Sequence, residues 1–235
     1  MPAFYFSRIL YKIKNKEKMK KYELTSETKV INGVELHRIK ALNSFGNIKE
    51  GDLGGWIESE KNLSQDGNAW VYDNAKVRGN ATIRGDAWVF DNAEVSGNVI
   101  VSENATISEN ATVRGNATVR GNATVRGNAS VSGNATVEDK AKVDGNAMVC
   151  ENVIVSWNAT VNGNVDFIVF KNWWSSGRYF TWTRSNNKWK VGCFYGSGEE
   201  LIAKAYKDSE KSGREYERVV KYVESILKEE NNDNE

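Results

Sequence analysis

The stretch "VRGNATVRGNATVRGNAS", from Val113 to Ser130, repeats one phrase of six residues three times. A period of six matches neither the 3.6 residues of a helical turn nor the alternation of a long strand, so each phrase must hold a short strand and a corner. A large apolar residue recurs at every sixth position from Val71 to Phe167, without an insertion. The repeat predicts a solenoid of regularly stacked coils.

A second apolar register lies two residues before the first. It is Ala at most steps and Val at Val99, Val153 and Val165. Because residues i and i−2 of a strand point to the same side, both registers face the same way. They predict a core in which a branched residue packs beside a small one.

The corners between the strands are usually Gly-Asn, and the Asn register from Asn62 to Asn164 is broken only by Asp86 and Lys140. Gly and Asn tolerate the left-handed backbone region, and stacked Asn side chains can hydrogen-bond along a ladder. We therefore interpret the Asn run as structural.

Hexads of this kind resemble the hexapeptide-repeat, left-handed parallel β-helix superfamily, over residues 62–168. The resemblance implies a mainly β fold in which three hexads form one coil of eighteen residues, giving about six coils. The lead-in "GNIKEGDLGGWIESEKNLSQDGNAWVYDNA" (46–75) and the tail "WSSGRYFTWTRSNNKWKVGCFYGSGEELIAKAY" (174–206) also resemble segments of β-helix proteins that bacteriophages and prophages encode.

The rest of the chain divides into three parts. Residues 1–18 form a basic leader that we expect to be poorly ordered or a loosely packed helix. Residues 19–61 are predicted to form an N-terminal hairpin and cap, with the turn at Asn32-Gly33. Residues 169–235 are rich in aromatic side chains and predict a small α+β domain with one hairpin and two helices.

The helices of this last part are placed by their boundary signals. Ser197 and Glu200 have capping-box spacing, which predicts a helix that runs to about Lys211. Gly213 is then expected to separate it from a second helix, with apolar residues such as Val220 and Val223 on one face.

Composition excludes several classes of function. The chain has a net charge of +1, and no segment has the basic balance of a dedicated nucleic-acid-binding protein. No run of eighteen apolar residues predicts a membrane span, and the short apolar stretch near Phe4 lacks the features of a signal peptide. Cys150 and Cys193 match no metal or redox spacing, and we expect buried or unreactive thiols. We expect a protein of the bacterial cytoplasm.

Catalysis is also disfavoured by the sequence. Acyltransferases of the resembling superfamily use a histidine base near a groove between subunits, often with a loop extruded from the coils. This chain has one histidine, His37, which lies outside the repeats, and the hexads contain no inserted loop. We therefore predict no catalytic residue, no metal ligand and no cofactor.

One candidate interface lies near the start of the repeats. Outward-facing aromatic residues fall one coil apart, which places four rings in a single patch: Trp70, Tyr72, Trp88 and Phe90. A patch of this kind must be covered. The N-terminal hairpin is the favoured cover, and a partner protein or second subunit is the alternative, because Trp and Tyr are common interface residues.

The main candidate interface lies in the C-terminal domain, where aromatic and basic residues alternate. Phe170, Trp173 and Trp174 are expected to cap the β-helix, which leaves the hairpin residues beyond them to bind a partner. These are Arg178, Tyr179, Trp182, Arg184, Lys188, Trp189 and Lys190. The alternation suits a protein interface or stacking on single-stranded nucleic acid, and the near-neutral charge favours protein. The alternative is structural: the same rings pack on the two helices of this domain.

Together these features predict a non-enzymatic interaction scaffold in which the β-helix is a rigid spacer. The resemblance to phage proteins extends the prediction to a protein that binds, and inhibits or modifies, a bacterial host machine, for example a defence nuclease such as a CRISPR effector. The alternatives are a relative of the hexapeptide acyltransferases and a single-stranded nucleic-acid-binding protein. A homo-oligomer is compatible with each of them.

Overall fold

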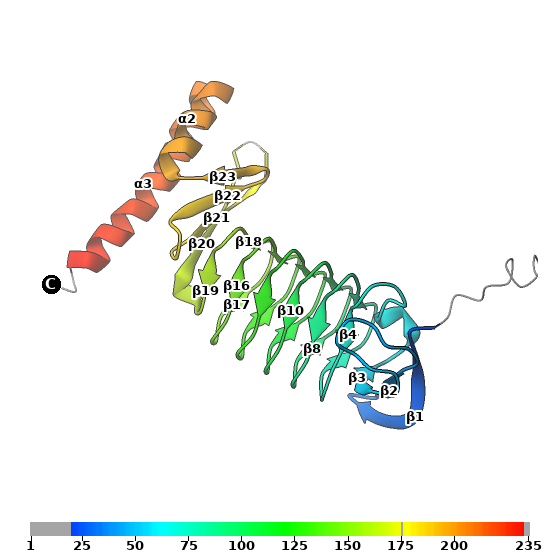
Figure 1. The fold of residues 1–235 in the computed structure, drawn as a ribbon. Helices are drawn as coiled ribbons and strands as arrows, with labels where there is room; N and C mark the ends of the chain where they lie inside the picture. The colour runs from blue at the N-terminus through cyan, green and yellow to red at the C-terminus, as the bar shows by residue number, and fades with distance from the viewer. Residues whose placement is uncertain (1–19, 175, 233–235) are drawn as a thin grey trace, which may run out of the picture.

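The computed structural model describes residues 20–174 and 176–232, so the predicted basic leader (1–18) lies outside the described residues. The chain forms a rod of stacked coils (Figure 1). Antiparallel strands extend one of its sheets at the N-terminal end, and a separate antiparallel sheet followed by two helices lies at the C-terminal end. No helix of the described ranges is both long and apolar enough to cross a membrane.

The rod is a parallel β-helix built from sixteen strands of two residues each. Strands three apart in the sequence pair in parallel with a shift of eighteen residues, as Thr118 pairs with Thr136, so three sheets run along the rod. The strands are β4 (Trp70–Val71), β5 (Lys76–Val77), β6 (Thr82–Ile83), β7 (Trp88–Val89), β8 (Glu94–Val95), β9 (Ile100–Val101), β10 (Thr106–Ile107), β11 (Thr112–Val113), β12 (Thr118–Val119), β13 (Thr124–Val125), β14 (Ser130–Val131), β15 (Thr136–Val137), β16 (Lys142–Val143), β17 (Met148–Val149), β18 (Ile154–Val155) and β19 (Thr160–Val161).

The two apolar registers form the core, as the sequence predicts. Val119, its neighbour Ala117 and the paired Val101 and Val137 are all fully buried. The exceptions lie at the end of the repeat, where Val165 of the second register is 74% exposed and Phe167 begins an antiparallel strand instead of continuing the coils. The repeat pattern in the sequence thus extends one step beyond the β-helix.

The corners explain the Gly-Asn pairs. Gly121 has φ +76°, a backbone conformation that favours glycine. A Cβ there would also lie 2.7 Å from the backbone N and O of Asp139 in the next coil, so both the backbone and the packing exclude a side chain. The predicted Asn ladder is confirmed: the Nδ2 groups donate to the Oδ1 atoms one coil later at 2.9–3.3 Å along Asn80, Asn98, Asn116, Asn134 and Asn152.

The N-terminal cap, residues 20–63, begins with the predicted hairpin. Strands β1 (Tyr22–Ile31) and β2 (Val34–Ala41) are joined by Asn32-Gly33, whose φ values of +52° and +78° are those of a two-residue hairpin turn. Strand β3 (Leu53–Ile57) pairs antiparallel with β2 and parallel with β5, and a 3-10 helix spans Glu60–Asn62. The cap is therefore continuous with one sheet of the β-helix.

The C-terminal cap is a four-stranded antiparallel sheet, where the sequence predicted only a hairpin. A 3-10 helix (Asn164–Asp166) leads into β20 (Phe167–Lys171), β21 (Tyr179–Thr183), β22 (Lys188–Val191) and β23 (Phe194–Gly196). Both outer strands were missed because the isolated runs are short, and β20 continues directly from the repeat pattern.

Two helices follow, α2 (Gly198–Asp208) and α3 (Glu210–Asn232). The capping box of Ser197 and Glu200 is confirmed. The predicted break at Gly213 is wrong, because the chain turns at Ser209 and Gly213 lies inside α3. A Cβ at Gly213 would lie 2.2 Å from the Tyr206 ring, so this glycine lets the two helices approach closely.

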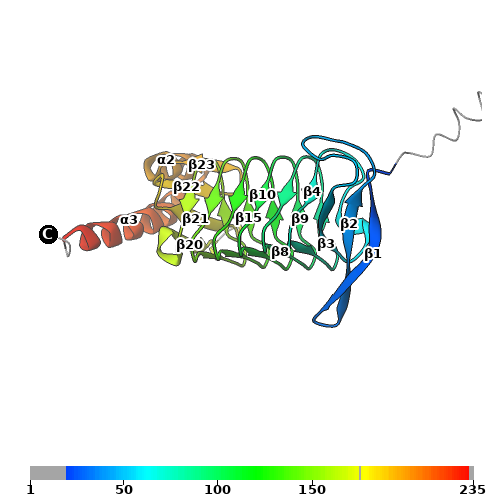
Figure 2. The ribbon, with the colours of Figure 1, turned by 60° about the horizontal axis from the view of Figure 1, so that its bottom comes forward.

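The sheet of the C-terminal cap separates two layers (Figure 2). One face, with Phe167 and Val169, packs on the core of the β-helix. The other face, with Phe180, Trp182 and Trp189, packs on the helices. The order of layers is thus coil, sheet, helix.

Candidate interaction sites at the two ends of the rod

The open end of a β-helix leaves backbone groups without partners, and here side chains of the C-terminal cap satisfy them. Within the rod each coil donates its N–H groups to carbonyls of the next coil, as Thr136 N does to Val153 O at 2.9 Å. The last coil has no successor, so its donors would be orphaned. Side-chain oxygens replace the missing carbonyls: Met148 N donates to Asn164 Oδ1 (2.8 Å), Ile154 N to Thr181 Oγ1 (3.2 Å) and Thr160 N to Ser185 Oγ (2.7 Å).

A buried carboxylate links the C-terminal cap to the coils. Glu138 is 8% exposed and receives Arg120 Nε at 3.1 Å and the Lys190 ammonium at 3.3 Å. Burial alone would raise the pKa of the Glu138 carboxyl, but the hydrogen bond from Arg120 and the charge of Lys190 outweigh it and the pKa is lowered. Lys190, a predicted partner contact, is thus occupied in holding the cap.

Aromatic packing at this end differs from the prediction. Phe170, Trp173 and Trp174 do not cap the coils: Phe170 and Trp174 pack with the helices, and Trp173 is 82% exposed. The capping side chains are Phe167 and Val169, because alternate residues of β20 face opposite sides. Beside them Trp157 of the last coil stacks on Tyr195 with ring centroids 4.8 Å apart.

The two tryptophans predicted to contact a partner are core residues. Trp182 and Trp189 are 1% and 2% exposed and pair across β21 and β22, with Trp182 Nε1 donating to Asn187 Oδ1 at 2.9 Å. This corrects the prediction of a partner contact and agrees with the structural alternative, because a ring packed under α3 presents no surface to a partner. Alternating aromatic and basic residues are found in a sheet whose aromatic face is buried as well as in a sheet whose aromatic face is exposed.

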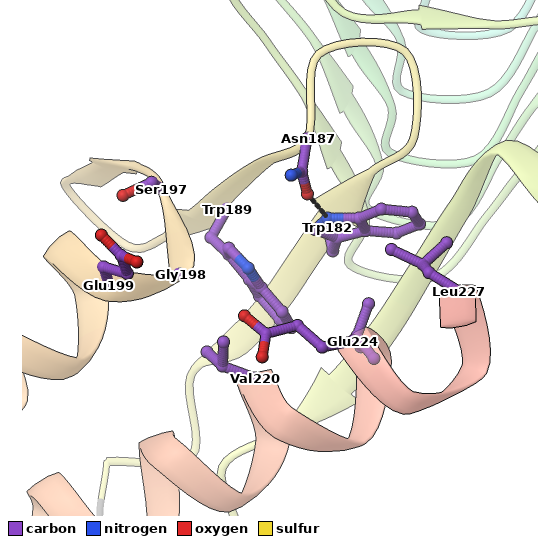
Figure 3. A pocket seen from close by; sticks show the side chains of 10 residues that line it. Trp182, Asn187, Trp189, Ser197, Gly198, Glu199, Val220, Glu224 and Leu227 are labelled. Atoms are coloured by element: carbon purple, nitrogen blue, oxygen red, sulfur yellow. Dashed lines mark hydrogen bonds between the residues drawn. The ribbon is translucent and has the colours of Figure 1, made fainter. Parts of the chain in front are cut away.

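The same two indoles form the floor of a small pocket of about 220 Å³ between the sheet and the helices (Figure 3). Glu224 from α3 and Glu199 at the start of α2 contribute carboxylates to its lining. Neither glutamate was singled out in the sequence, because nothing in a helical charge pattern shows which side chain borders a cavity.

The remaining predicted contact residues divide into two groups. Arg184 forms an ion pair with Glu230 near the end of α3, with Nη1 and Oε2 2.8 Å apart. Arg178 is exposed, whereas Tyr179 and Lys188 are partly buried. A partner-binding role for these last three stays a prediction.

Two exposed aromatic side chains stand out on the C-terminal part of the molecule, Trp173 at 82% and Tyr222 at 57%. Each contacts the aromatic core at its edge: Trp173 lies 6.0 Å from Trp174, and Tyr222 lies 6.0 Å from Phe170, measured between ring centroids. Sequence reasoning assigned Trp173 to the cap and did not single out Tyr222.

At the N-terminal end the groups that lack partners are acceptors, because no preceding coil donates N–H groups to the carbonyl oxygens of the first coil. The Lys21 ammonium donates to Ala69 O at 2.9 Å and Gly67 O at 3.3 Å, and the Tyr22 hydroxyl donates to Leu63 O at 2.7 Å. Both ends of the rod are therefore closed by side chains of matching hydrogen-bond character.

The N-terminal cap also covers part of the predicted aromatic patch. Trp70 is fully buried, with the rings of Tyr22 and Phe45 edge-on to it at 6.1 and 5.3 Å. A partner contact by Trp70 is thus wrong, and the favoured prediction of an intramolecular cover is confirmed for this ring. Tyr72, Trp88 and Phe90 stay partly exposed.

Burial of Lys21 predicts a pH dependence of stability. Burial lowers the pKa of this ammonium to about 8 from an ordinary value of 10.5, against the charges of Asp66 and Asp86, which raise it. Between these two pH values the unfolded chain holds a proton that the folded chain has lost, so stability must rise with pH. From pH 8 to 10 we expect the unfolding free energy to increase by about 2 kcal/mol, measured with urea.

A matched variant isolates this effect. Lys21→Met removes the titrating group but retains the aliphatic stem, so its stability should change less over the same range. Lys29, whose pKa burial also lowers, is present in both chains and cancels in the comparison. Equal pH slopes for the two proteins would contradict the assignment.

Comparison with known proteins agrees with this architecture. Residues 61–166 match the family model described as "Bactofilin: Polymer-forming cytoskeletal". The chain is also 36% identical over 63 residues to the "Uncharacterized acetyltransferase YdcK" of Escherichia coli (strain K12). That match covers 23% of this chain and 19% of the relative, so the chain spans about a fifth of that protein's length. Sequence repeat, coil geometry and both matches agree that the chain contains a hexapeptide-repeat parallel β-helix.

Proposed function

We propose that this protein is a non-enzymatic scaffold that binds another protein through its C-terminal part. The observation that carries the proposal is the exposure of Trp173 and Tyr222 on the sheet and helix layers beyond the coils. Large exposed aromatic side chains attached to a rigid core are typical of protein-binding surfaces, because they bury much apolar area at little cost in side-chain entropy. The pair is called the tip aromatics below.

The closed ends favour a protein of fixed size over a polymer that grows by end-to-end stacking of the coils. The matching family is described as polymer-forming, and a rod of coils could extend by stacking end on end. In this chain Thr181 and Ser185 already occupy donors of the last coil, and Lys21 and Tyr22 occupy acceptors of the first. A second copy stacked on either end would have to displace these bonds, so self-association of the predicted homo-oligomer would have to use the sides of the rod.

The identity of the partner rests on the resemblance alone. A bacterial host protein, inhibited or modified during infection, stays a prediction, and the C-terminal surface described above would be the part that contacts it. The comparisons point to a β-helix scaffold and carry no information on a target.

Acetyl transfer is the alternative that one comparison favours, through the name of the matched relative. In this chain His37 sits in β2 between Thr28 and Ile57 of the flanking strands, within the N-terminal cap. The nucleic-acid alternative has less support, because the indoles of Trp182 and Trp189 are buried and two of the basic residues beside them, Arg184 and Lys190, are held in ion pairs.

A capture experiment with matched variants tests the proposal. Purified full-length protein is immobilised, and bound proteins from bacterial extract are quantified for wild type, for Trp173→Ser with Tyr222→Ser, and for Val165→Ser. Val165 is 74% exposed and is the control for loss of an apolar surface residue elsewhere. We expect a specific protein that binds to wild type and to the control and is reduced at least tenfold with the double variant.

Circular dichroism must show that all three proteins are folded. A captured set that is the same for the double variant and wild type would overturn the assignment of binding to the tip aromatics. Turnover of acetyl-CoA by the purified protein, lost in His37→Ala, would favour the enzyme alternative instead.

A further inference from the structure

A second feature of the surface lies at the N-terminal end, where the sequence repeats a seven-residue phrase one coil apart. The phrases are "AWVYDNA" (69–75) and "AWVFDNA" (87–93). Trp70 and Trp88 pair in register, so Tyr72 and Phe90 follow them on the same side of the rod. The N-terminal cap covers Trp70 and leaves the other three rings at the surface.

These three rings, with Asn47 and Asp73, line a cleft of about 300 Å³, called the aromatic cleft below. Tyr72 and Trp88 stand 5.3 Å apart between centroids, with their planes inclined at 49°. The inclined rings of Tyr72 and Trp88 therefore form adjoining walls of the aromatic cleft. The volume lies at the small end of the range for small-molecule sites.

Charge around the aromatic cleft is negative. The pKa of the Tyr72 hydroxyl is raised by burial and, after that, by the carboxylates of Asp52 and Asp73. Asp73 forms no hydrogen bond or ion pair with any described residue. Its equivalent one coil later, Asp91, accepts a hydrogen bond from Glu109 N at 3.0 Å. Among the described residues, the carboxylate that borders the cleft thus has no partner, and it can act as the counter-ion of a bound cation.

No basic side chain of residues 20–174 and 176–232 lies over the rings of the aromatic cleft. Elsewhere in the N-terminal cap, ring faces carry a basic side chain: Lys29 lies 3.9 Å from the Trp56 centroid and Lys21 lies 5.0 Å from that of Phe45. Over the rings of Tyr72, Trp88 and Phe90, in contrast, stands no Lys or Arg of the described ranges.

We propose that the aromatic cleft binds an alkylated ammonium group, with Tyr72, Trp88 and Phe90 around the cation and Asp73 as its counter-ion. Ring faces carry negative quadrupole charge and attract cations that are weakly hydrated, of which quaternary ammonium groups are the chief example. An anion would be repelled by Asp52 and Asp73. A neutral apolar ligand would gain nothing from the unpaired carboxylate. The proposal does not depend on the function proposed for the C-terminal part.

Two small molecules of nearly equal shape test the charge. Choline carries a quaternary ammonium group, and 3,3-dimethyl-1-butanol replaces its nitrogen with carbon. Binding of each to the full-length protein is followed by titration calorimetry and by the shift of the indole N–H signals in NMR spectra. We expect choline to bind about tenfold more tightly than the neutral alcohol, because only choline gains the attraction between a cation and the ring faces.

Variants then test the residues. Asp73→Asn retains the shape, and Asn tolerates the left-handed backbone at this position, where φ is +49°. It should weaken choline binding about fivefold and leave binding of the alcohol unchanged. Asp91→Asn, one coil further along, is the matched control and should change neither. Phe90→Leu should weaken choline binding without loss of the folded state, as judged by thermal unfolding.

Equal affinity for choline and the alcohol would overturn the proposal, because the aromatic cleft would then be an apolar crevice without selectivity for charge. Absence of choline binding would overturn it as well, as would binding that Asp73→Asn leaves unchanged.

Discussion

Val119→Asp is expected to prevent the β-helix from folding. Val119 lies in the middle of the rod, fully buried between Val101 and Val137 of the adjacent coils. A carboxylate at this position would have neither water nor an ion-pair partner, and an uncompensated buried charge costs about 3–5 kcal/mol or more. Because every coil supports the next, the loss should affect the whole rod, seen by circular dichroism as loss of the cooperative thermal transition.

The neighbouring residue provides the control. Thr118 occupies the same strand but faces outward, beside Ile100 and Thr136. Thr118→Asp introduces the same charge into water, so the change in stability should be about 1 kcal/mol or less. A Val119→Asp protein with the thermal stability of the wild type would show that the inward register is wrong.

Tyr22→Ala is expected to open the N-terminal end of the rod. The ring of Tyr22 is fully buried against Trp70, and its hydroxyl donates to Leu63 O at 2.7 Å, with Glu60 O as a second acceptor 3.1 Å away. Removing a buried aromatic ring leaves a cavity and costs about 3–5 kcal/mol in unfolding free energy, measured with urea.

Tyr22→Phe separates the two contributions. It retains the ring and removes only the donor, which leaves the buried Leu63 carbonyl without this hydrogen bond, at a cost of about 1–3 kcal/mol. If Tyr22→Ala and Tyr22→Phe lost equal stability, packing on Trp70 would contribute nothing. If neither lost stability, the cap would not close the coil end.

The rod could be predicted from the sequence because the fixed period of the repeat determines which residues lie in contact. A period of six with three hexads per coil places residues eighteen apart in contact, and Thr118 does pair with Thr136. The same arithmetic placed Trp70 beside Trp88. These contacts depend on a backbone repeat that every coil shares, so a single error of register would have violated the pattern along the whole rod.

The ends could not be predicted in the same way, because they depend on single side-chain contacts between parts distant in the sequence. Nothing in the local sequence marks Thr181 as the partner of Ile154 N, or Lys190 as the partner of Glu138. Alternation in β21 and β22 showed that Trp182 and Trp189 share a face, but the face is buried only because α3 packs on it. Both faces of this short sheet are buried because the coils and the helices pack on them, and the strands alone do not reveal that packing.

The central claim is that the rod is closed at both ends and functions as a discrete particle. Sedimentation velocity of the full-length protein over a hundredfold range of concentration tests it most directly. We predict one species, of 26.3 kDa or a small fixed multiple, whose sedimentation coefficient does not grow with concentration. Species that lengthen steadily with concentration, seen as filaments by electron microscopy, would contradict the claim, because coils could then stack through ends that the caps should block.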